Sequence, residues 1–179
     1  MLKNIIGHTA TVLKHKWYVF RLCCKAGIPF RGIIHDLSKF SPTEFFESVK
    51  YYSGTKSPIY YCKKENGYSR AWLHHKGRNK HHYEYWFDSK APNPTPIIPY
   101  KYAIEMVCDT FAAGMAYQGK NWTKEYQLSY WESRERPGHY LNPKINDFLN
   151  RVYKDVAEKG LDEVINKKNL KKLYYEYTK

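Results

Sequence analysis

The segment from Leu2 to Lys25 contains no proline, and its one glycine is Gly7. Along this segment six side chains recur at alternating spacings of three and four residues: Ile5, His8, Val12, His15, Val19 and Leu22. Such spacing places them on one face of an α-helix, and an apolar stripe of this kind faces a protein core. The segment therefore predicts a long amphipathic helix that turns two histidines inward.

The rest of the chain shows similar helical periodicity, interrupted by turn signals. Ser41, Pro42 and Glu44 supply an N-cap, a proline at the first helical position and an acid at the third, so a helix begins there. Gly77 weakens the continuation of a helix that starts near Ser69. Helices are predicted at about 29–39, 42–52, 69–82, 100–117, 144–158 and 161–176, with connections at 53–68 and at the proline-rich 91–99.

A chain of 179 residues is long enough for one hydrophobic core, so we expect a single all-α domain over residues 1–179. Its core would occupy about 1–120, and a helical extension about 121–179. The helix at 29–39 presents an apolar surface of Phe30, Ile33, Ile34 and Leu37. No apolar run approaches the roughly 20 residues that cross a bilayer, and the four cysteines show no C-x-x-C spacing. These features predict a reduced, cytoplasmic protein with no membrane partner.

The sequence holds 30 lysines and arginines against 17 aspartates and glutamates, a formal net charge of +13. This balance favours anionic partners such as nucleotides, nucleic acid or acidic surfaces, without choosing among them. Residues 1–40 contain seven basic residues and one acid, Asp36. The 18 tyrosines and five tryptophans could stack on nucleic-acid bases, although aromatic residues at helical spacing are more often core. The sequence therefore leaves open whether nucleic acid is a binding partner.

Seven of the eight histidines precede residue 83, and they cluster by predicted element. They are His8 and His15 on the first helix, His35 beside Asp36, and four in the block HHKGRNKHH at 74–82. Neutral imidazole and carboxylate are ligands of Mn, Fe, Zn and Ni, and short intervals along helices let several converge on one point. Asp109 adds a carboxylate among apolar residues of a later helix, where burial is costly without a partner or a metal. This pattern predicts a metal site.

The run GIIHDLSKF at 32–40 resembles the His-Asp signature of the HD superfamily of metal-dependent phosphohydrolases. That resemblance implies an HD-domain-like helical bundle around a site for two divalent transition-metal ions, with Mn, Fe, Zn and Ni not distinguished. It also implies the metal ligands: His15 upstream, the pair His35 and Asp36, the added His74, His81 and His82, and the late aspartate Asp109.

The strings HDLSKFSPTEF and WLHHKGRNKHHYEYW are also similar to an uncharacterised HD-like family of phages and bacteria, over roughly residues 8–118. The sequence departs from the superfamily pattern by Ser38 in place of glycine and by a compressed interval between its later histidine groups. The compression leaves His75 as an alternative ligand to His74. His8 is an alternative to His15, because both lie on the same helical stripe.

From the resemblance we expect a phosphohydrolase or phosphodiesterase that acts on a nucleotide or a nucleotide-derived phosphate ester. Asp36 would bridge two ions, and a metal-bound hydroxide would attack phosphorus. Lys39 would neutralise a phosphate oxygen in the transition state, and Arg78 and Lys80 would bind the substrate. Two alternatives stay open: an HD-type di-iron oxygenase, and a non-catalytic, metal-stabilised binder of nucleic acid or another anionic ligand.

Overall fold

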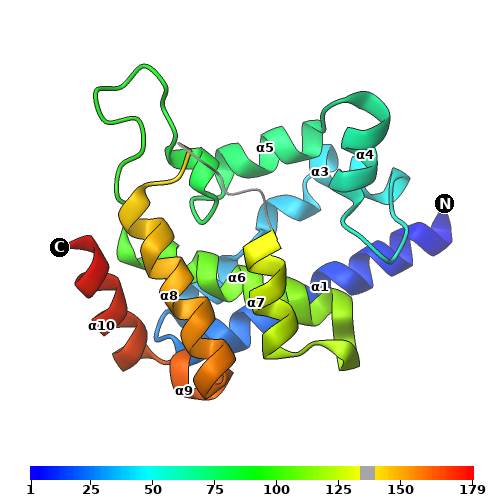
Figure 1. Cartoon of the computed structure of the whole chain (residues 1–179). Helices are drawn as coiled ribbons and strands as arrows, with labels where there is room; N and C mark the ends of the chain where they lie inside the picture. Colours follow the sequence, from blue (N-terminus) through cyan, green and yellow to red (C-terminus); the bar gives the residue numbers. More distant parts are fainter. Residues whose placement is uncertain (134–139) are drawn as a thin grey trace.

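The computed structural model describes residues 1–133 and 140–179, and every regular element in these ranges is helical (Figure 1). The α-helices are α1 (Leu2–Lys25), α2 (Pro29–Ile34), α3 (Pro42–Lys50), α4 (Pro58–Asn66), α5 (Arg70–Arg78), α6 (Tyr100–Gln118), α7 (Lys124–Ser133), α8 (Pro143–Lys159), α9 (Leu161–Val164) and α10 (Lys167–Thr178). Short 3-10 helices lie at η1 (Leu37–Phe40), η2 (Tyr83–Trp86) and η3 (Gly119–Asn121). The predicted all-α class is confirmed.

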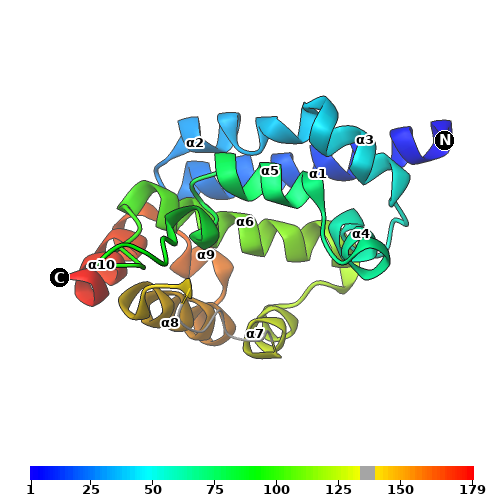
Figure 2. The ribbon, with the colours of Figure 1, turned by 90° about the horizontal axis from the view of Figure 1, so that it is seen from above.

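The helices form layers around α6. Figure 2 shows α2 and α3 along one edge of the molecule, α7 and α8 along the opposite edge, and α6 between them. α1 packs along α6, and one hydrophobic core joins Val19 of α1 and Phe111 of α6 to Phe148 of α8 and Leu170 of α10. The C-terminal helices therefore share the core of the N-terminal ones, because their apolar faces close over the same central helix.

Serine caps set where the helices near the histidines begin. Ser41 is the N-cap of α3, as predicted, and its Oγ accepts a hydrogen bond from Glu44 N at 3.5 Å. Ser69 caps α5 in the same way. The carboxylate of Glu47 on α3 accepts hydrogen bonds from Ser69 Oγ and from two backbone N–H groups in the first turn of α5. This carboxylate holds the start of α5 against α3.

Several element boundaries differ from those expected from the sequence. α2 ends at Ile34 rather than near residue 39, and α5 ends at Arg78, so that the later histidines lie beyond α5. α4 lies within the predicted connection at 53–68, and α7 lies in a part of the predicted helical extension where no individual helix is placed. Only Pro58 and Cys62 are buried on α4, and only Gln127 on α7. Such helices have no apolar stripe, so periodicity cannot reveal them.

The apolar side chains of α2 and η1 are largely exposed rather than packed in the core. Phe30, Ile33 and Leu37 are 67%, 58% and 56% exposed. α2 instead contacts α1 at Gly32, where a Cβ would lie only 2.8 Å from the Cα of Phe20. Despite this exposed surface, no helix in the described part of the chain is both long and apolar enough to cross a bilayer.

We expect Gly32→Ala to destabilise the protein by about 1–3 kcal/mol, because the added methyl group must push α2 away from the backbone of α1. The matched control is Gly77→Ala, since a Cβ at this helical glycine meets nothing within 4 Å. That control should be neutral or stabilising by up to about 1 kcal/mol through helix propensity. Urea denaturation monitored by circular dichroism measures both changes. Equal effects of the two substitutions would contradict the close packing of α2 on α1.

Candidate metal centre

The His35–Asp36 pair lies in a tight turn between α2 and η1. Asp36 has φ 53 and ψ 30, and in the described part of the chain it is the one residue other than glycine with positive φ. Aspartate tolerates this left-handed conformation better than most residues, at a cost of about 1 kcal/mol or more. Lys16 Nζ donates a hydrogen bond to the His35 carbonyl oxygen, which ties the turn to α1. As a result both side chains point inward, and each residue is only 1% exposed.

The first cluster consists of His15, His35, Asp36 and Asp109, whose ligand atoms all lie within 4.8 Å of one another. His15 Nε2 lies 3.0 Å from Asp109 Oδ1 and 3.3 Å from His35 Nε2. His35 Nε2 lies 3.2 Å from Asp36 Oδ2 and 3.3 Å from Asp109 Oδ1. Helices α1 and α6 and the turn after α2 therefore bring two imidazoles and two carboxylates to one point.

The second cluster consists of Asp36, His75, His81 and His82. Asp36 Oδ1 lies 3.4 Å from His75 Nε2 and 3.3 Å from His81 Nε2. Asp36 belongs to both clusters, with Oδ2 directed at the first and Oδ1 at the second. Among the described residues, Asp36 Oδ1, His81 Nε2 and His82 Nε2 are buried without a hydrogen-bond partner. Buried lone pairs that converge in this way fit a cation, which would satisfy all of them together.

Two buried glutamates hold the imidazoles by the ring nitrogens that face away from the clusters. Glu105 Oε1 lies 3.0 Å from His35 Nδ1 and 3.4 Å from His81 Nδ1, and its other oxygen accepts a hydrogen bond from Arg31 Nε at 2.7 Å. Glu44 Oε2 lies 2.7 Å from His75 Nδ1. Carboxylates in this position fix the tautomer and the orientation of a ligating histidine. They leave the Nε2 atoms of these histidines directed at Asp36.

Electrostatics keep the carboxylates of both clusters ionised. Burial alone would raise the pKa of Asp36, but His35 and Lys39 hold it well below its usual value. Burial is likewise outweighed at Asp109, whose pKa is held low by hydrogen bonds to His15 and His35. Burial alone would raise the pKa of Glu105, but its hydrogen bond to His35 and the neighbouring imidazole of His81 lower it to about 2. All three side chains are therefore carboxylates at neutral pH.

The pKa of His35 is shifted in the opposite direction to those of His15 and His82. Burial and Lys39 lower the pKa of His15, and burial and the neighbouring His81 lower that of His82 well below its usual value. Burial also favours neutral His35, but Asp36, Asp109 and Glu105 outweigh it and raise the pKa of His35 well above its usual value. Without a metal, His35 is thus protonated and carries positive charge among the carboxylates. A bound metal ion would displace this proton and compensate the carboxylates instead.

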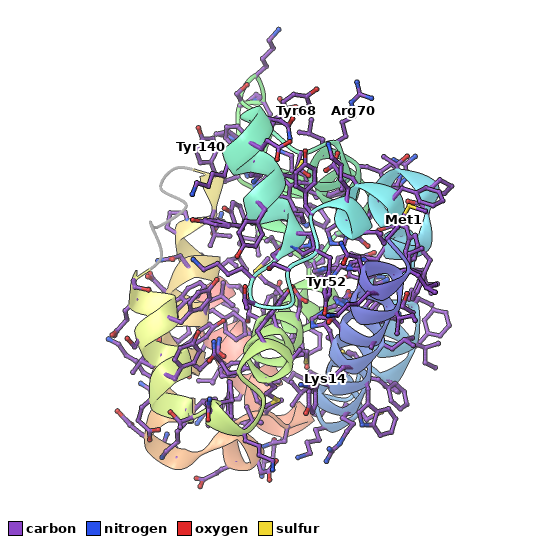
Figure 3. The ribbon with its side chains drawn as sticks, turned by 90° about the vertical axis from the view of Figure 1, so that its right-hand side faces the viewer. Met1, Lys14, Tyr52, Tyr68, Arg70 and Tyr140 are labelled. Atoms are coloured by element: carbon purple, nitrogen blue, oxygen red, sulfur yellow. The ribbon has the colours of Figure 1, made fainter. Side chains whose placement is uncertain are left out.

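The clusters line a cavity of about 780 Å³. Lys39 also lines it, and Lys39 Nζ lies 2.6 Å from Asp36 Oδ2. Burial opposes the charge on Lys39, yet Asp36 and Asp109 raise its pKa above the usual lysine value. Tyr52 forms another part of the wall beside α1, near the centre of the face seen in Figure 3. The cavity therefore combines buried carboxylates and imidazoles with the ammonium group of Lys39, which Asp36 holds in place.

Most of the predicted ligands come together in these clusters. They are His15, His35, Asp36, His81, His82 and Asp109. His74 lies outside both clusters, because adjacent residues on a helix point about 100° apart and its Nδ1 instead contacts Glu44 Oε1 at 2.6 Å. His75 takes the position that His74 was expected to fill. The predicted continuation of this helix to residue 82 is wrong, since α5 ends at Arg78 and His81 and His82 lie beyond it.

The remaining predicted residues lie elsewhere. His8 is in neither cluster but is 6% exposed, lines the cavity and contacts the rings of Phe45 and Tyr52. Neither Arg78 nor Lys80 lines the cavity, and the ammonium group of Lys80 instead lies over the rings of two tyrosines. Their expected role in substrate binding finds no support in the geometry.

Sequence reasoning missed the two orienting glutamates. Glu105 precedes Asp109 by four residues and so lies on the same face of α6, which is the one signal that could have marked it. Glu44 was recognised only as an acid near a helix start, although its side chain reaches two histidines of α5.

A family model described as a family of unknown function, DUF5662, matches residues 4–155. The chain belongs to this family. The DUF5662 match includes every residue of both clusters and both orienting glutamates. It also extends through α7 to Asp155 in α8, and ends before α9 and α10. No curated protein and no solved structure matches the chain.

The burial of His8 predicts acid sensitivity. Burial and Lys39 lower the pKa of His8 to about 4 in the folded protein. The unfolded chain, with a histidine pKa of about 6.5, therefore takes up the proton first, and stability is lost as the pH falls from about 6.5 to about 4. We expect His8→Gln to remove up to about 3 kcal/mol of this loss. The free energy of unfolding of the wild-type protein and of the His8→Gln variant, measured from pH 7 to pH 4, tests this expectation. The same pH dependence in both proteins would contradict it.

Proposed function

We propose that this DUF5662 protein is a metal-dependent hydrolase of phosphate esters of the HD type. One observation carries the proposal: the buried carboxylate of Asp36 directs one oxygen at each of two clusters of imidazoles and carboxylates. Both clusters line one cavity. This arrangement is what a site for two adjacent divalent ions requires, since a carboxylate can bind one ion with each oxygen.

The residues fit such ions by their chemistry. His15, His35, Asp36 and Asp109 would hold one ion, and Asp36 would share the other with the imidazoles of the second cluster. Imidazole and carboxylate together suit Mn, Fe, Zn or Ni, and this set contains no thiolate that would select a softer metal. When bound, the ions supply water activation and positive charge opposite a phosphate group.

Lys39 is the residue that we assign to the substrate phosphate. Its ammonium group lines the cavity beside Asp36, and its raised pKa keeps it charged at neutral pH. A fixed cation at this position would pair with a phosphate oxygen and stabilise the negative charge that increases in the transition state. The net charge of +13 would draw anionic substrates toward the protein.

Glu105 and Glu44 are positioning residues in this proposal. Glu105 and Glu44 pair with the nitrogens of His35 and His75 that face away from Asp36, and Glu105 also lies 3.4 Å from His81 Nδ1. The opposite nitrogens are thus kept directed into the clusters. Arg31 neutralises Glu105, which allows that carboxylate to stay buried and ionised. Loss of such an orienting group typically lowers metal affinity or activity by about 10- to 100-fold.

A panel of phosphate esters tests the function directly. Protein loaded in turn with Mn²⁺, Fe²⁺, Zn²⁺ and Ni²⁺ should release phosphate or a monophosphate from nucleoside monophosphates, cyclic nucleotides or p-nitrophenyl phosphate. Asp36→Asn should lower kcat/KM by at least about 10³-fold, because removing one group that stabilises transition-state charge already costs about 10²–10³. Asp147→Asn, at an exposed aspartate of α8, is the matched control. Absence of hydrolysis with every metal would refute the proposal.

Metal titrations test whether His75, rather than His74, is a metal ligand. His75→Ala should weaken binding of the second ion by at least about 100-fold, since it removes a direct ligand rather than an orienting group. His74→Ala removes a histidine that is 20% exposed and bound only to Glu44, and should retain both ions with little change. Calorimetric titration and elemental analysis measure stoichiometry and affinity. Similar losses in both variants would contradict the second cluster.

An oxidative function is the second candidate, favoured by the five imidazoles that the two clusters contain. Such a histidine-rich set would also suit two irons that react with dioxygen. Protein prepared anaerobically with iron and then exposed to oxygen distinguishes the candidates. Substrate-dependent oxygen uptake would favour the oxygenase, and ester hydrolysis without oxygen uptake would favour the hydrolase.

A further inference from the structure

Helices α7 and α8 line the side of the cavity opposite the His/Asp clusters (Figure 2). Tyr126, Tyr130 and Trp131 line it from α7, and we call these three residues the α7 wall. In Figure 2, α7 and α8 lie on the far side of α6 from α2 and α3. A cavity of about 780 Å³ is within the range of pockets that enclose ligands far larger than inorganic phosphate. The size of the cavity therefore indicates an ester with a substantial organic group.

The tyrosines of the α7 wall are not core residues. Tyr126 and Tyr130 are 38% and 50% exposed, and their rings are nearly parallel, at 16° with centroids 6.4 Å apart. Exposed parallel rings at a cavity wall offer flat surfaces on which another planar ring can stack. An aliphatic ester would leave these surfaces uncovered.

Behind the tyrosines, the wall is braced by stacked rings. Trp131 stacks on Tyr153 of α8 with centroids 4.4 Å apart, and Tyr153 stacks on Phe111 of α6 at 4.8 Å. The Trp131 indole N–H donates a hydrogen bond to Asn150 Oδ1 at 2.7 Å. This stack connects the wall to the core, so the wall has a defined position before any ligand binds.

A second anchor fixes α7 on α6. The side chain of Gln127 is 1% exposed, accepts a hydrogen bond from Trp122 Nε1 at 2.9 Å and donates one to the Thr110 carbonyl oxygen at 3.3 Å. It fits there because residue 114 is glycine. A Cβ at Gly114 would lie 2.0 Å from Gln127 Oε1. A side chain at residue 114 would therefore displace the Gln127 amide and weaken this anchor of α7, and Gly114 lies outside both clusters.

An independent observation indicates that the cavity takes a polar ligand. Among the described residues, His8 Nε2 is buried without a hydrogen-bond partner, although His8 lines the cavity and is only 6% exposed. An orphaned ring nitrogen in such a place is costly unless something in the cavity satisfies it. The DUF5662 match also extends through α7 to Asp155, so the wall lies within the family region.

We infer that the cavity binds phosphate esters with a planar aromatic ring system, the chemical class of nucleotides, with the ring against the α7 wall and the phosphate toward the clusters. The inference rests on the proposed function for the phosphate end alone. The ring end depends on the exposed parallel tyrosines, and His8 offers a hydrogen bond to the same ligand.

The test compares ligands that differ only in the ring. Binding of AMP, GMP, CMP and UMP to the metal-loaded protein is followed by stopped-flow tryptophan fluorescence before turnover, with ribose 5-phosphate as competitor. The best nucleotide should bind at least about 10-fold more tightly than ribose 5-phosphate, as stacking of one base on an aromatic side chain allows. Equal affinities would overturn the inference.

Two variants and a matched control locate the effect. Tyr130→Leu should remove most of the advantage of the nucleotide over ribose 5-phosphate. Tyr68→Leu should not, because Tyr68 is equally exposed but lies at the edge of the molecule in Figure 3, outside the cavity lining. Gly114→Ala should weaken nucleotide binding by displacing α7, while metal content and ribose 5-phosphate binding stay unchanged. Equal effects of Tyr130→Leu and Tyr68→Leu would overturn the inference.

The outcomes also separate the inference from the proposed function. Ring-dependent binding without hydrolysis of any ester would refute the hydrolase and leave the α7 wall as a recognition surface. If ribose 5-phosphate is hydrolysed as efficiently as the best nucleotide, the hydrolase is supported and recognition of the ring by the α7 wall is refuted.

Discussion

Burial of the Asp36 carboxylate is the interaction on which the rest of the site depends. An ionised carboxylate that is 1% exposed is tolerable only if cations and imidazoles surround it, because the desolvation cost is several kcal/mol. The chain brings such partners to it from different elements, among them Lys39 from η1, His35 from the preceding turn, His75 from α5 and His81 from the segment after α5. The left-handed backbone at Asp36 is part of the same requirement, since it turns the side chain from the surface helix α2 into the interior.

Charge compensation then extends outward from Asp36 in layers. His35 contacts Asp36 and Asp109 with one nitrogen and Glu105 with the other, and Arg31 neutralises Glu105 in turn. The carboxylate of Glu105, which holds His35, thus has its own cation, and this branch of the network ends at Arg31 near the surface. The basic N-terminal sequence, with one acid in its first 40 residues, takes on a structural meaning here. It supplies Lys16, Arg31 and Lys39 around that acid.

The fold class and most of the site follow from local patterns. The stripe of α1 carries His15 to its position, and the serine-proline start at Ser41 places α3 correctly, because periodicity and capping are short-range physics. The choice between His74 and His75 was beyond such reasoning, since it depends on the rotation of α5 about its axis. That rotation is set by contacts of Glu44 and Glu47 from another helix. Glu105 could not be identified for a similar reason, because the sequence does not distinguish a buried glutamate from an exposed one until the packing of its helix is known.

In the proposed hydrolase, the C-terminal helices would limit which esters reach the histidine clusters. Residues before 120 contain every ligand atom of the clusters, yet a cavity open on that side would admit any phosphate ester that diffuses in. Docking of α7 through Gln127 and Gly114 gives the cavity a second, aromatic wall without touching the ligands. In this proposal, the reactive groups and the recognition surface are carried by different parts of the chain. The α7 wall would then set substrate preference without taking part in metal binding, because Gln127, Trp131 and Gly114 anchor it and none of them belongs to a cluster.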